Sequence, residues 1–292
     1  MIKIPVAIIG AGPAGVAAAI QLKRYGVDFM IFEKGEIGGL LKNANYIENY
    51  IGFPQGIGGK QMVKLIARHL KSLGIAVATE EVVSIDFVDG SFSIQSDNQQ
   101  YLSEYLIIAS GTRAVTDDKV SIDAKANERI FYEIADIDTE NLNHAAIIGS
   151  GDAAYDYALN LSTKGVTSTI YMRGKDSNAL PLLMERAKSD ERIKIVGKHS
   201  LTEVNRKDNL DLCFNTDDGI KNYEADCLLF AIGREPELCY LSDSLLNIHK
   251  RLTEEEKLIF AGDVKNKIYR QASISSGDGI FAAMKIYRKL NQ

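Results

Sequence analysis

One sequence pattern occurs twice in this chain of 292 residues. It covers Val6–Gly15 and again Ala145–Ala154, each time as an apolar, β-branched run followed by glycines at the spacing GxGxx(G/A). Gly26–Val27 and Gly165–Val166 continue the correspondence. Each copy predicts a buried strand, a glycine turn, a helix and a second strand, which together form a dinucleotide-binding unit. Two such units predict two bound dinucleotides and a route for electrons between them. The alternative is a doubly wound repeat that binds no nucleotide.

The small residues of each copy have separate physical roles. The first glycine allows the tight turn out of the strand, and the second lets the backbone approach a pyrophosphate closely. The third small residue lets the helix pack close to the strand, and the N-terminus of that helix directs free N–H groups at the phosphates. Asp152 has an alternative role as the N-cap of its helix. The residues predicted to line the two sites are Gly10, Gly12, Pro13, Ala14 and Gly15, and Gly149, Ser150, Gly151, Asp152, Ala153 and Ala154.

The two copies differ at the end of their second strands. The first copy ends this strand with Glu33, whose carboxylate can accept hydrogen bonds from the two hydroxyls of a ribose. The equivalent position of the second copy is Met172, followed by Arg173 and Lys175. No acid stands there to repel a 2′-phosphate, and two cations can pair with one. The second unit is therefore predicted to prefer NADP(H) to NAD(H), with two ordinary surface charges as the alternative.

Composition and charge exclude several classes of protein. The net charge of −5 argues against nucleic acid as a major partner. No apolar run approaches the roughly 18 residues of a membrane-spanning helix. The chain begins directly with a predicted strand, which predicts no signal peptide and a cytoplasmic location. The histidines form no constellation that suggests catalysis or a metal site, and His69 and His144 are predicted to be structural.

The second half of the chain repeats the plan of the first. Gly233–Arg234–Glu235–Pro236 predicts a linker that returns the chain to the first domain. The fold class is therefore α/β, with two Rossmann-like (three-layer ββα) dinucleotide-binding domains, the second inserted into the first. The first domain is predicted over residues 1–113 and 234–292, and the second over residues 114–233. Strands of the second domain are predicted near residues 193–196, 201–206, 211–215 and 226–232.

Further motifs accompany the two units over nearly the whole chain. Phe32–Glu33–Lys34–Gly35 is followed by Gly38–Gly39, and then by Glu48–Asn49–Tyr50–Ile51–Gly52–Phe53–Pro54. Near the end come Ala261–Gly262–Asp263–Val264 and Tyr269–Arg270–Gln271–Ala272. In this combination the chain resembles the low-molecular-weight thioredoxin reductases and their relatives. The resemblance implies FAD on the first unit and NADPH on the second.

The resemblance also implies roles for individual residues. Asp263 would contact the ribityl chain or a phosphate of the flavin, and Asn49 and the Gly38–Gly39 turn would contact its ring. Val82 would contact the adenine. Backbone N–H groups at a helix start would stabilise negative charge on the reduced flavin. The residues implied near the pyrimidine edge of the ring are Arg270, Gln271 and Ala272. The other residues implied to contact the cofactors are Lys34, Leu40, Ala109, Ser110, Gly111, Ile232 and Gly233.

The chain departs from the family at the expected redox-active CxxC pair. That pair should lie within residues 132–138, where the sequence has Glu133–Ile134–Ala135–Asp136. The only cysteines are Cys213, Cys227 and Cys239, and none belongs to a CxxC pair. Carboxylates and alkyl groups cannot exchange with a disulfide. We therefore expect a hydride to pass from NADPH to the flavin and electrons to pass directly to an external acceptor, with no catalytic side chain. A second departure is Gly174–Lys175 in place of a further arginine.

The acceptor and some rival functions stay open. Relatives without the dithiol include flavodoxin, ferredoxin and quinone reductases, so one of these acceptors is expected. Ferredoxin-reducing members often add a C-terminal segment over the ring, and its absence after Gln292 weakens that choice. Alternatives are a flavoprotein reduced by a partner such as ferredoxin without pyridine nucleotide, a disulfide or polysulfide reductase that uses Cys239 or a substrate thiol, and a flavin- or nucleotide-binding regulatory protein. A homodimer is implied by the resemblance alone.

Overall fold

The computed structural model describes all residues, 1–292, and the chain forms two compact units. The first unit contains Met1–Lys42, Ile47–Arg113 and Glu235–Gln292. The second contains Asn43–Tyr46 and Ala114–Arg234. The second unit is thus inserted into the sequence of the first, and it also includes a short segment of the long loop that follows the first glycine motif. The sequence pattern gave no sign of that segment's place.

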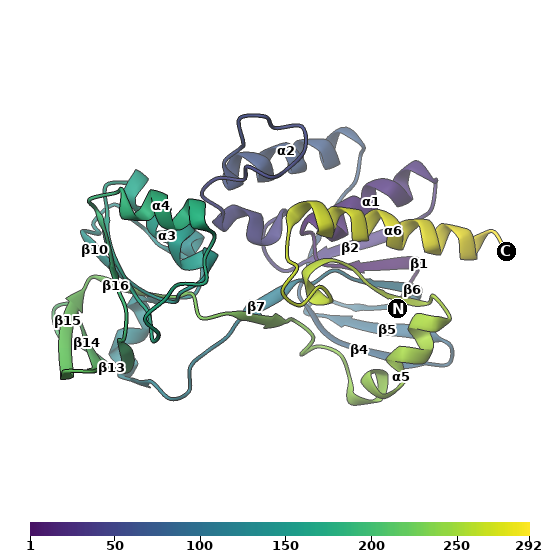
Figure 1. The fold of residues 1–292 in the computed structure, drawn as a ribbon. Helices are drawn as coiled ribbons and strands as arrows, with labels where there is room; N and C mark the ends of the chain where they lie inside the picture. The colour runs from purple at the N-terminus through teal and green to yellow at the C-terminus, as the bar shows by residue number, and fades with distance from the viewer. The chain divides into compact units, whose positions relative to one another are not determined.

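The first unit is built on a seven-stranded sheet with the order β3-β2-β1-β6-β5-β4, in which β18 also pairs with β6 (Figure 1). Strands β1, β2, β3, β6 and β18 are parallel, whereas β4, β5 and β6 form an antiparallel meander. The strands are β1 (Ile2–Ile9), β2 (Phe29–Glu33), β3 (Ala78–Thr79), β4 (Val82–Val88), β5 (Ser91–Ser96), β6 (Gln100–Ile108) and β18 (Leu258–Phe260). The helices are α1 (Pro13–Arg24), α2 (Gly59–Ser72), α5 (Asp243–Glu254) and α6 (Ala272–Leu290), with the 3-10 helices η1 (Gly39–Asn43) and η4 (Gly262–Val264).

Both sides of β1 are buried. Residues 6–9 of β1 are all buried, because α1 and α6 pack on one side and a second cluster, with residues of β4, β5 and α5, encloses the other. Helices α1 and α6 approach each other closely, since a Cβ built at Gly279 would lie 1.9 Å from the backbone oxygen of Ala14. The carboxyl ends of β1, β2 and β6 meet at one edge of the sheet, and α1 begins there. This edge is where a parallel sheet presents a ligand site.

The second unit has a parallel sheet between a helical layer and a smaller sheet. Its five-stranded sheet has the order β12-β11-β10-β16-β9, and its four-stranded sheet has the order β15-β14-β13-β8. One buried cluster joins the parallel sheet to α3 and α4, and another joins it to β13 and β14. The strands are β8 (Ser121–Ile122), β9 (Ile130–Phe131), β10 (His144–Ile148), β11 (Thr167–Tyr171), β12 (Ile193–Val196), β13 (Ser200–Arg206), β14 (Leu210–Thr216), β15 (Gly219–Ala225) and β16 (Cys227–Phe230). The helices are α3 (Asp152–Thr163) and α4 (Pro181–Lys188), with the 3-10 helices η2 (Ala124–Arg129) and η3 (Ile134–Asp136).

The elements that were not anticipated from the sequence include β15, β17 (Arg234–Pro236) and α5. Strand β17 pairs with β7 (Thr112–Ala114), so the predicted return linker is a strand. Strand β15 completes a hairpin with β14 around a turn with Gly219 at positive φ. Helix α5 has Ser242 as its N-cap, with the Ser242 hydroxyl accepting from the backbone N–H of Leu245. A capping serine followed by apolar residues at helical spacing was a signal in the sequence for this helix.

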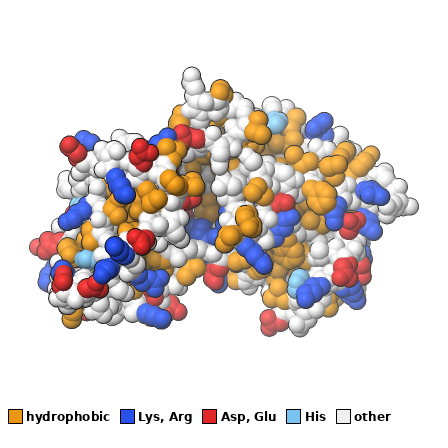
Figure 2. Space-filling model, in the orientation of Figure 1, with side chains coloured by type: hydrophobic (Ala, Val, Ile, Leu, Met, Phe, Trp, Pro, Cys, Tyr) orange, Lys and Arg blue, Asp and Glu red, His pale blue; other side chains and the backbone are white.

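The surface carries mixed charges. Figure 2 shows acidic and basic side chains interspersed over the visible face, without a broad area of one sign. No helix has both the length and the apolar character needed to cross a membrane.

Candidate functional site

The first glycine turn leaves space where a pyrophosphate is expected. Gly10 has a φ of +100°, and a Cβ there would lie 2.5 Å from the backbone oxygen of Ala109. A Cβ at Gly15 would lie 1.8 Å from the backbone oxygen of Gly10. A Cβ at Gly12, by contrast, would meet no protein atom within 4 Å. Gly10 and Gly15 are therefore required by the fold, whereas Gly12 faces open space beside an uncapped helix N-terminus. That arrangement fits a bound diphosphate.

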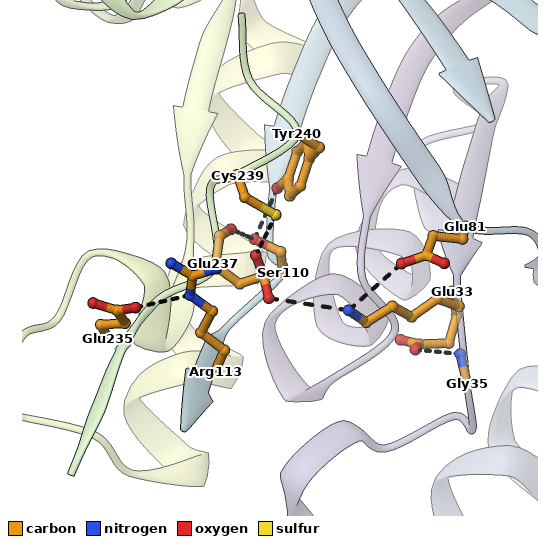
Figure 3. Close-up of polar contacts among 10 residues, drawn as sticks. Glu33, Gly35, Glu81, Ser110, Arg113, Glu235, Glu237, Cys239 and Tyr240 are labelled. Atoms are coloured by element: carbon orange, nitrogen blue, oxygen red, sulfur yellow. Dashed lines mark hydrogen bonds and ion pairs between the residues drawn. The ribbon is translucent and has the colours of Figure 1, made fainter. Parts of the chain in front are cut away.

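Five residues predicted to bind FAD line one cavity at the carboxyl edge of the first sheet. Glu33 lies at the end of β2, and its carboxylate accepts hydrogen bonds from the backbone N–H groups of Ala11 at 2.7 Å and Gly35 at 2.9 Å. These two bonds orient the carboxylate, and Figure 3 shows the one with Gly35. The cavity lies beside Glu33 at the end of β2, where an acidic residue of this fold binds the hydroxyls of a ribose. The predicted residues that line it are Gly10, Glu33, Lys34, Val82 and Ser110.

The same cavity contains residues that the sequence analysis missed. Glu237, on the segment that follows β17, lies with its carboxylate 4.0 Å from the Lys34 amine, and Glu81 lies 3.8 Å from that amine on the other side (Figure 3). Glu237 also accepts a hydrogen bond from the Cys239 thiol at 2.9 Å. No local pattern could reveal these residues, because they are distant in sequence from the glycine turn. Cys239, which the sequence suggested only as an alternative redox thiol, also lines the cavity. The missed residues that line it are Glu80, Glu81, Glu237 and Tyr240.

The residues expected near the flavin ring come together in part. The Asn49 side-chain amide donates a hydrogen bond to the Gln271 side-chain oxygen at 2.8 Å, across 222 positions of sequence. Asp263 accepts a hydrogen bond from the Ser275 hydroxyl at 2.8 Å. Helix α6 begins at Ala272 without a side-chain cap, so its first N–H groups have no side-chain acceptor. An uncapped helix start here fits the expected partial negative charge of the flavin pyrimidine.

The Gly38–Gly39 turn packs on the first glycine turn. Gly38 donates a backbone hydrogen bond to Ala11 at 2.8 Å, and both glycines have positive φ. A Cβ on Gly39 would lie 3.3 Å from the Cα of Gly12. The next residue, Leu40, lies in η1. The backbone hydrogen bond thus holds the long loop beside the predicted diphosphate site, and the positive φ of both glycines disfavours larger residues there.

The second glycine turn repeats the geometry of the first. Gly149 has a φ of +158°, and a Cβ there would lie 2.4 Å from the backbone oxygen of Ala231. A Cβ at Gly151 would have only the Asn178 side-chain oxygen within 4 Å, at 3.7 Å. The Ser150 hydroxyl donates to that same Asn178 oxygen at 3.1 Å. The turn therefore keeps open space at its second glycine, as in the first unit, beside Ile232 and Gly233, which follow β16.

The suggestion that Asp152 caps its helix is wrong. The N-cap of α3 is Gly151, and no side chain caps this end. Asp152 is the first helical residue, and its carboxylate accepts a hydrogen bond from the backbone N–H of Leu180 at 2.7 Å. The carboxylate thus fixes the loop that leads into α4. The sequence favoured a cap because aspartate is common at that position, but the glycine turn already occupies it.

Two cations follow β11 as predicted. Arg173 is exposed, and its guanidinium lies 3.9 Å from the carboxylate of Asp117. Lys175 is exposed and makes no ion pair. Both follow the strand that corresponds to β2 in the first unit. The pair with Asp117 was not predicted.

Carboxylates stand where the family resemblance implies a dithiol. Glu133 accepts hydrogen bonds from the Asn43 side-chain amide and from the Arg234 guanidinium, each at 2.6 Å. Ile134 is buried, and Ala135 donates its backbone N–H to Asn43. The position is therefore filled by a charged hydrogen-bond network and an apolar side chain. Neither can exchange with a disulfide.

Burial raises the pKa of Asp156, in the neighbouring helix α3, to about 6, against a partly offsetting hydrogen bond from the backbone N–H of Asn45 at 2.9 Å. The folded protein therefore binds a proton more tightly than the unfolded chain, and its stability falls as pH rises from about 4 to about 6. We expect Asp156→Asn to raise the free energy of unfolding by about 1–3 kcal/mol above pH 6, since one pKa unit corresponds to about 1.4 kcal/mol. The gain should vanish below about pH 4.

Urea unfolding of wild type and Asp156→Asn between pH 4 and pH 8 measures this difference. Asp208→Asn, in an exposed turn, is the matched control and should behave like the wild type. A variant that is less stable than the wild type at pH 8 would contradict the assignment of a buried, charged Asp156.

The fold and the two open glycine turns are those of the class of dinucleotide-binding proteins. Comparison with known families is more specific. Residues 4–279 match the model of the pyridine nucleotide-disulphide oxidoreductase family, and the chain belongs to that family. It is an NAD(P)H-dependent flavin oxidoreductase of the thioredoxin reductase type, with FAD and NADPH as its cofactors.

Known relatives match over the whole chain. Thioredoxin reductase of Chlamydia trachomatis is 27% identical over 97% of this chain and 97% of the relative. Bifunctional thioredoxin reductase/thioredoxin of Mycobacterium leprae is 28% identical over 98% of this chain and 65% of the relative. The structure of T. acidophilum thioredoxin reductase superimposes with a TM-score of 0.88 at 24% identity, covering 100% of both chains. These structural matches confirm the predicted α/β fold with Rossmann-like domains.

Proposed function

We propose that this protein transfers a hydride from NADPH, bound on the second unit, to FAD, bound on the first, and passes the electrons to an external acceptor without a protein dithiol. FAD supplies the chemistry that accepts a hydride and releases its two electrons. The observation that carries the proposal is the pair of open glycine turns in a chain with no CxxC sequence. In this proposal the first domain covers residues 1–113 and 234–292, and the second covers residues 114–233.

The chain's own residues bind and orient the two cofactors. Glu33, already held by two backbone N–H groups, has remaining lone pairs for the ribose of FAD. The uncapped start of α1 faces the diphosphate, and the uncapped start of α6 faces the pyrimidine. On the second unit, the start of α3 and the cations Arg173 and Lys175 receive the phosphates of NADPH. None of these groups needs to gain or lose a proton.

The acceptor we propose is a flavodoxin, a ferredoxin or a quinone. The three cysteines are unpaired, with Cys227 buried and Cys239 exposed, so no internal sulfur relay leads to thioredoxin. The similar proteins described above are nevertheless named thioredoxin reductases. Two structures named bacillithiol disulfide reductase also share the fold, at 20% and 18% identity. Direct reduction of a disulfide substrate is therefore the second candidate.

One anaerobic experiment distinguishes these functions. The yellow protein is mixed with NADPH or NADH, and bleaching of the flavin absorbance is followed in a stopped-flow instrument. Fast bleaching by NADPH, followed by reoxidation with flavodoxin, ferredoxin or a quinone, supports the proposal. If neither coenzyme bleaches the flavin but added reduced ferredoxin does, the protein is instead a flavoprotein reduced by a partner. Bleaching of the flavin that none of the acceptors reverses would favour a regulatory flavoprotein.

Replacement of Cys239 by serine tests the disulfide candidate. The thiol donates to the Glu237 carboxylate, and this hydrogen bond with a carboxylate raises the pKa of Cys239, which disfavours the reactive thiolate. We therefore expect Cys239→Ser to keep turnover with NADPH and the acceptor within about twofold of wild type, because serine preserves the hydrogen bond. Steady-state kinetics with each acceptor measures this. Loss of most activity with a disulfide substrate would revive a thiol mechanism.

A homodimer and a cytoplasmic location remain predictions from the resemblance and the sequence. Light scattering of the purified, FAD-loaded protein at several concentrations tests the first. Fractionation of the native cells tests the second.

A further inference from the structure

Asp117 lies beside Arg173, one of the two cations proposed to bind the coenzyme on the second unit. Its carboxylate lies 3.9 Å from the guanidinium of Arg173. The Arg173 side chain is 63% exposed and the Asp117 side chain 22% exposed, so the acid is the more confined partner. The two residues are 56 positions apart, and only the fold brings them together.

Backbone contacts place Asp117 at the coenzyme edge of the second unit. Val115 donates its N–H to the backbone oxygen of Gly233, immediately after β16, at 3.1 Å. Asp117 begins a turn in which Val120 donates its N–H to the Asp117 backbone oxygen at 3.1 Å. Its carboxylate accepts the N–H of Lys119 at 3.2 Å. The side chain is therefore held at the carboxyl ends of the parallel strands, where a dinucleotide binds in this fold.

A carboxylate in this place opposes a 2′-phosphate. A phosphate monoester carries a charge of about −1.5 to −2 at neutral pH and binds best to a guanidinium that can donate two parallel hydrogen bonds. Asp117 competes for those donors and repels the incoming phosphate. NADH has a ribose hydroxyl instead, which carries no charge to repel. A carboxylate in this position would therefore reduce affinity for NADPH and leave affinity for NADH nearly unchanged.

We propose that Asp117 is a specificity-determining residue that limits the preference of this protein for NADPH over NADH by pairing with Arg173. The inference rests on the proposed function, since it needs the coenzyme on the second unit. Arg173 and Lys175 attract the 2′-phosphate, and Asp117 weakens that attraction by pairing with Arg173. Removing the charge of Asp117 should make the protein more selective for NADPH.

The test measures binding of coenzyme fragments by titration calorimetry on the FAD-loaded protein. The probes are 2′,5′-ADP, which carries the 2′-phosphate, and 5′-ADP, which lacks it. Asp117→Asn should tighten binding of 2′,5′-ADP about fivefold, from one opposed charge near 4 Å in a solvated site, and change 5′-ADP less than twofold. Asp118→Asn, the exposed neighbour that accepts from the Thr116 hydroxyl, is the matched control and should change neither.

The route through Arg173 is tested by a double variant. Arg173→Met alone should weaken 2′,5′-ADP, and in that background Asp117→Asn should gain much less than fivefold, because the acid then has no guanidinium to occupy. A full gain in that background, or no gain from Asp117→Asn alone with unchanged thermal stability, overturns the inference. Failure of the wild type to bind either fragment overturns the coenzyme site itself, and the inference falls with it.

Discussion

Gly12→Ala is expected to give a folded protein that binds FAD much more weakly. The added methyl group meets no protein atom within 4 Å, and Gly12 has a φ of −71°, which alanine adopts freely. The methyl group would instead occupy the space of the diphosphate. An extra methyl in a filled site costs about 1–3 kcal/mol, and each 1.4 kcal/mol is a tenfold change, so FAD should bind about 10–100-fold more weakly. Absorbance at the flavin maximum and titration of the apoprotein with FAD measure this.

Gly15→Ala is the contrasting variant. Its Cβ would lie 1.8 Å from the backbone oxygen of Gly10, so the helix must move from the strand and the protein should lose stability as well as FAD. Thermal unfolding monitored by circular dichroism separates the two variants. If Gly12→Ala remains yellow with unchanged FAD affinity, the diphosphate does not lie at this turn, and the assignment of the first unit is wrong.

Gly151→Ala is expected to retain FAD and to need a much higher NADPH concentration for reduction of the flavin. The added methyl has only the Asn178 oxygen nearby, at 3.7 Å, and Gly151 has a φ of −98°, so the fold should tolerate it. The methyl again fills the proposed diphosphate position, this time on the second unit. We expect NADPH to bind about 10–100-fold more weakly, by the same cost of about 1–3 kcal/mol. Flavin bleaching at increasing NADPH concentration should therefore need far more coenzyme.

Dithionite provides the control for this variant. It reduces flavin without a coenzyme site, so Gly151→Ala and wild type should bleach equally with it. Wild-type bleaching of Gly151→Ala by low concentrations of NADPH would show that the coenzyme uses another site. Together, Gly12→Ala and Gly151→Ala should each weaken binding of one cofactor, which assigns the two cofactors to the two units independently.

Most of the fold could be predicted because its signals are local. The glycine spacing, the apolar strands before it and the small residues after it lie within ten residues in each copy, and each has one physical reason. Strand β15 and helix α5 were not predicted, for two different reasons. Strand β15 is mostly exposed and lacks a strong apolar pattern, whereas α5 carried a cap and a helical pattern that went unused.

The candidate site was predicted less completely. Glu33 and Arg173 could be found from their distance to a glycine turn, since the end of the second strand has a fixed place in this fold. The suggestion that Asp152 caps its helix was wrong, because an aspartate at a helix start has several partners available and only the fold selects the N–H of Leu180. The cavity residues Glu81 and Glu237 had no sequence signal at all.

The sequence by itself determined that two dinucleotide turns exist and that no CxxC dithiol accompanies them, because glycine spacing and residue identity are local properties. Only the tertiary structure decided what surrounds those turns. It placed Glu237 and Glu81 on either side of Lys34, joined Asn49 to Gln271, and set Asp117 against Arg173. Such pairs form because crossover connections and loops bring together residues that lie tens to hundreds of positions apart. No local sequence pattern contains this information.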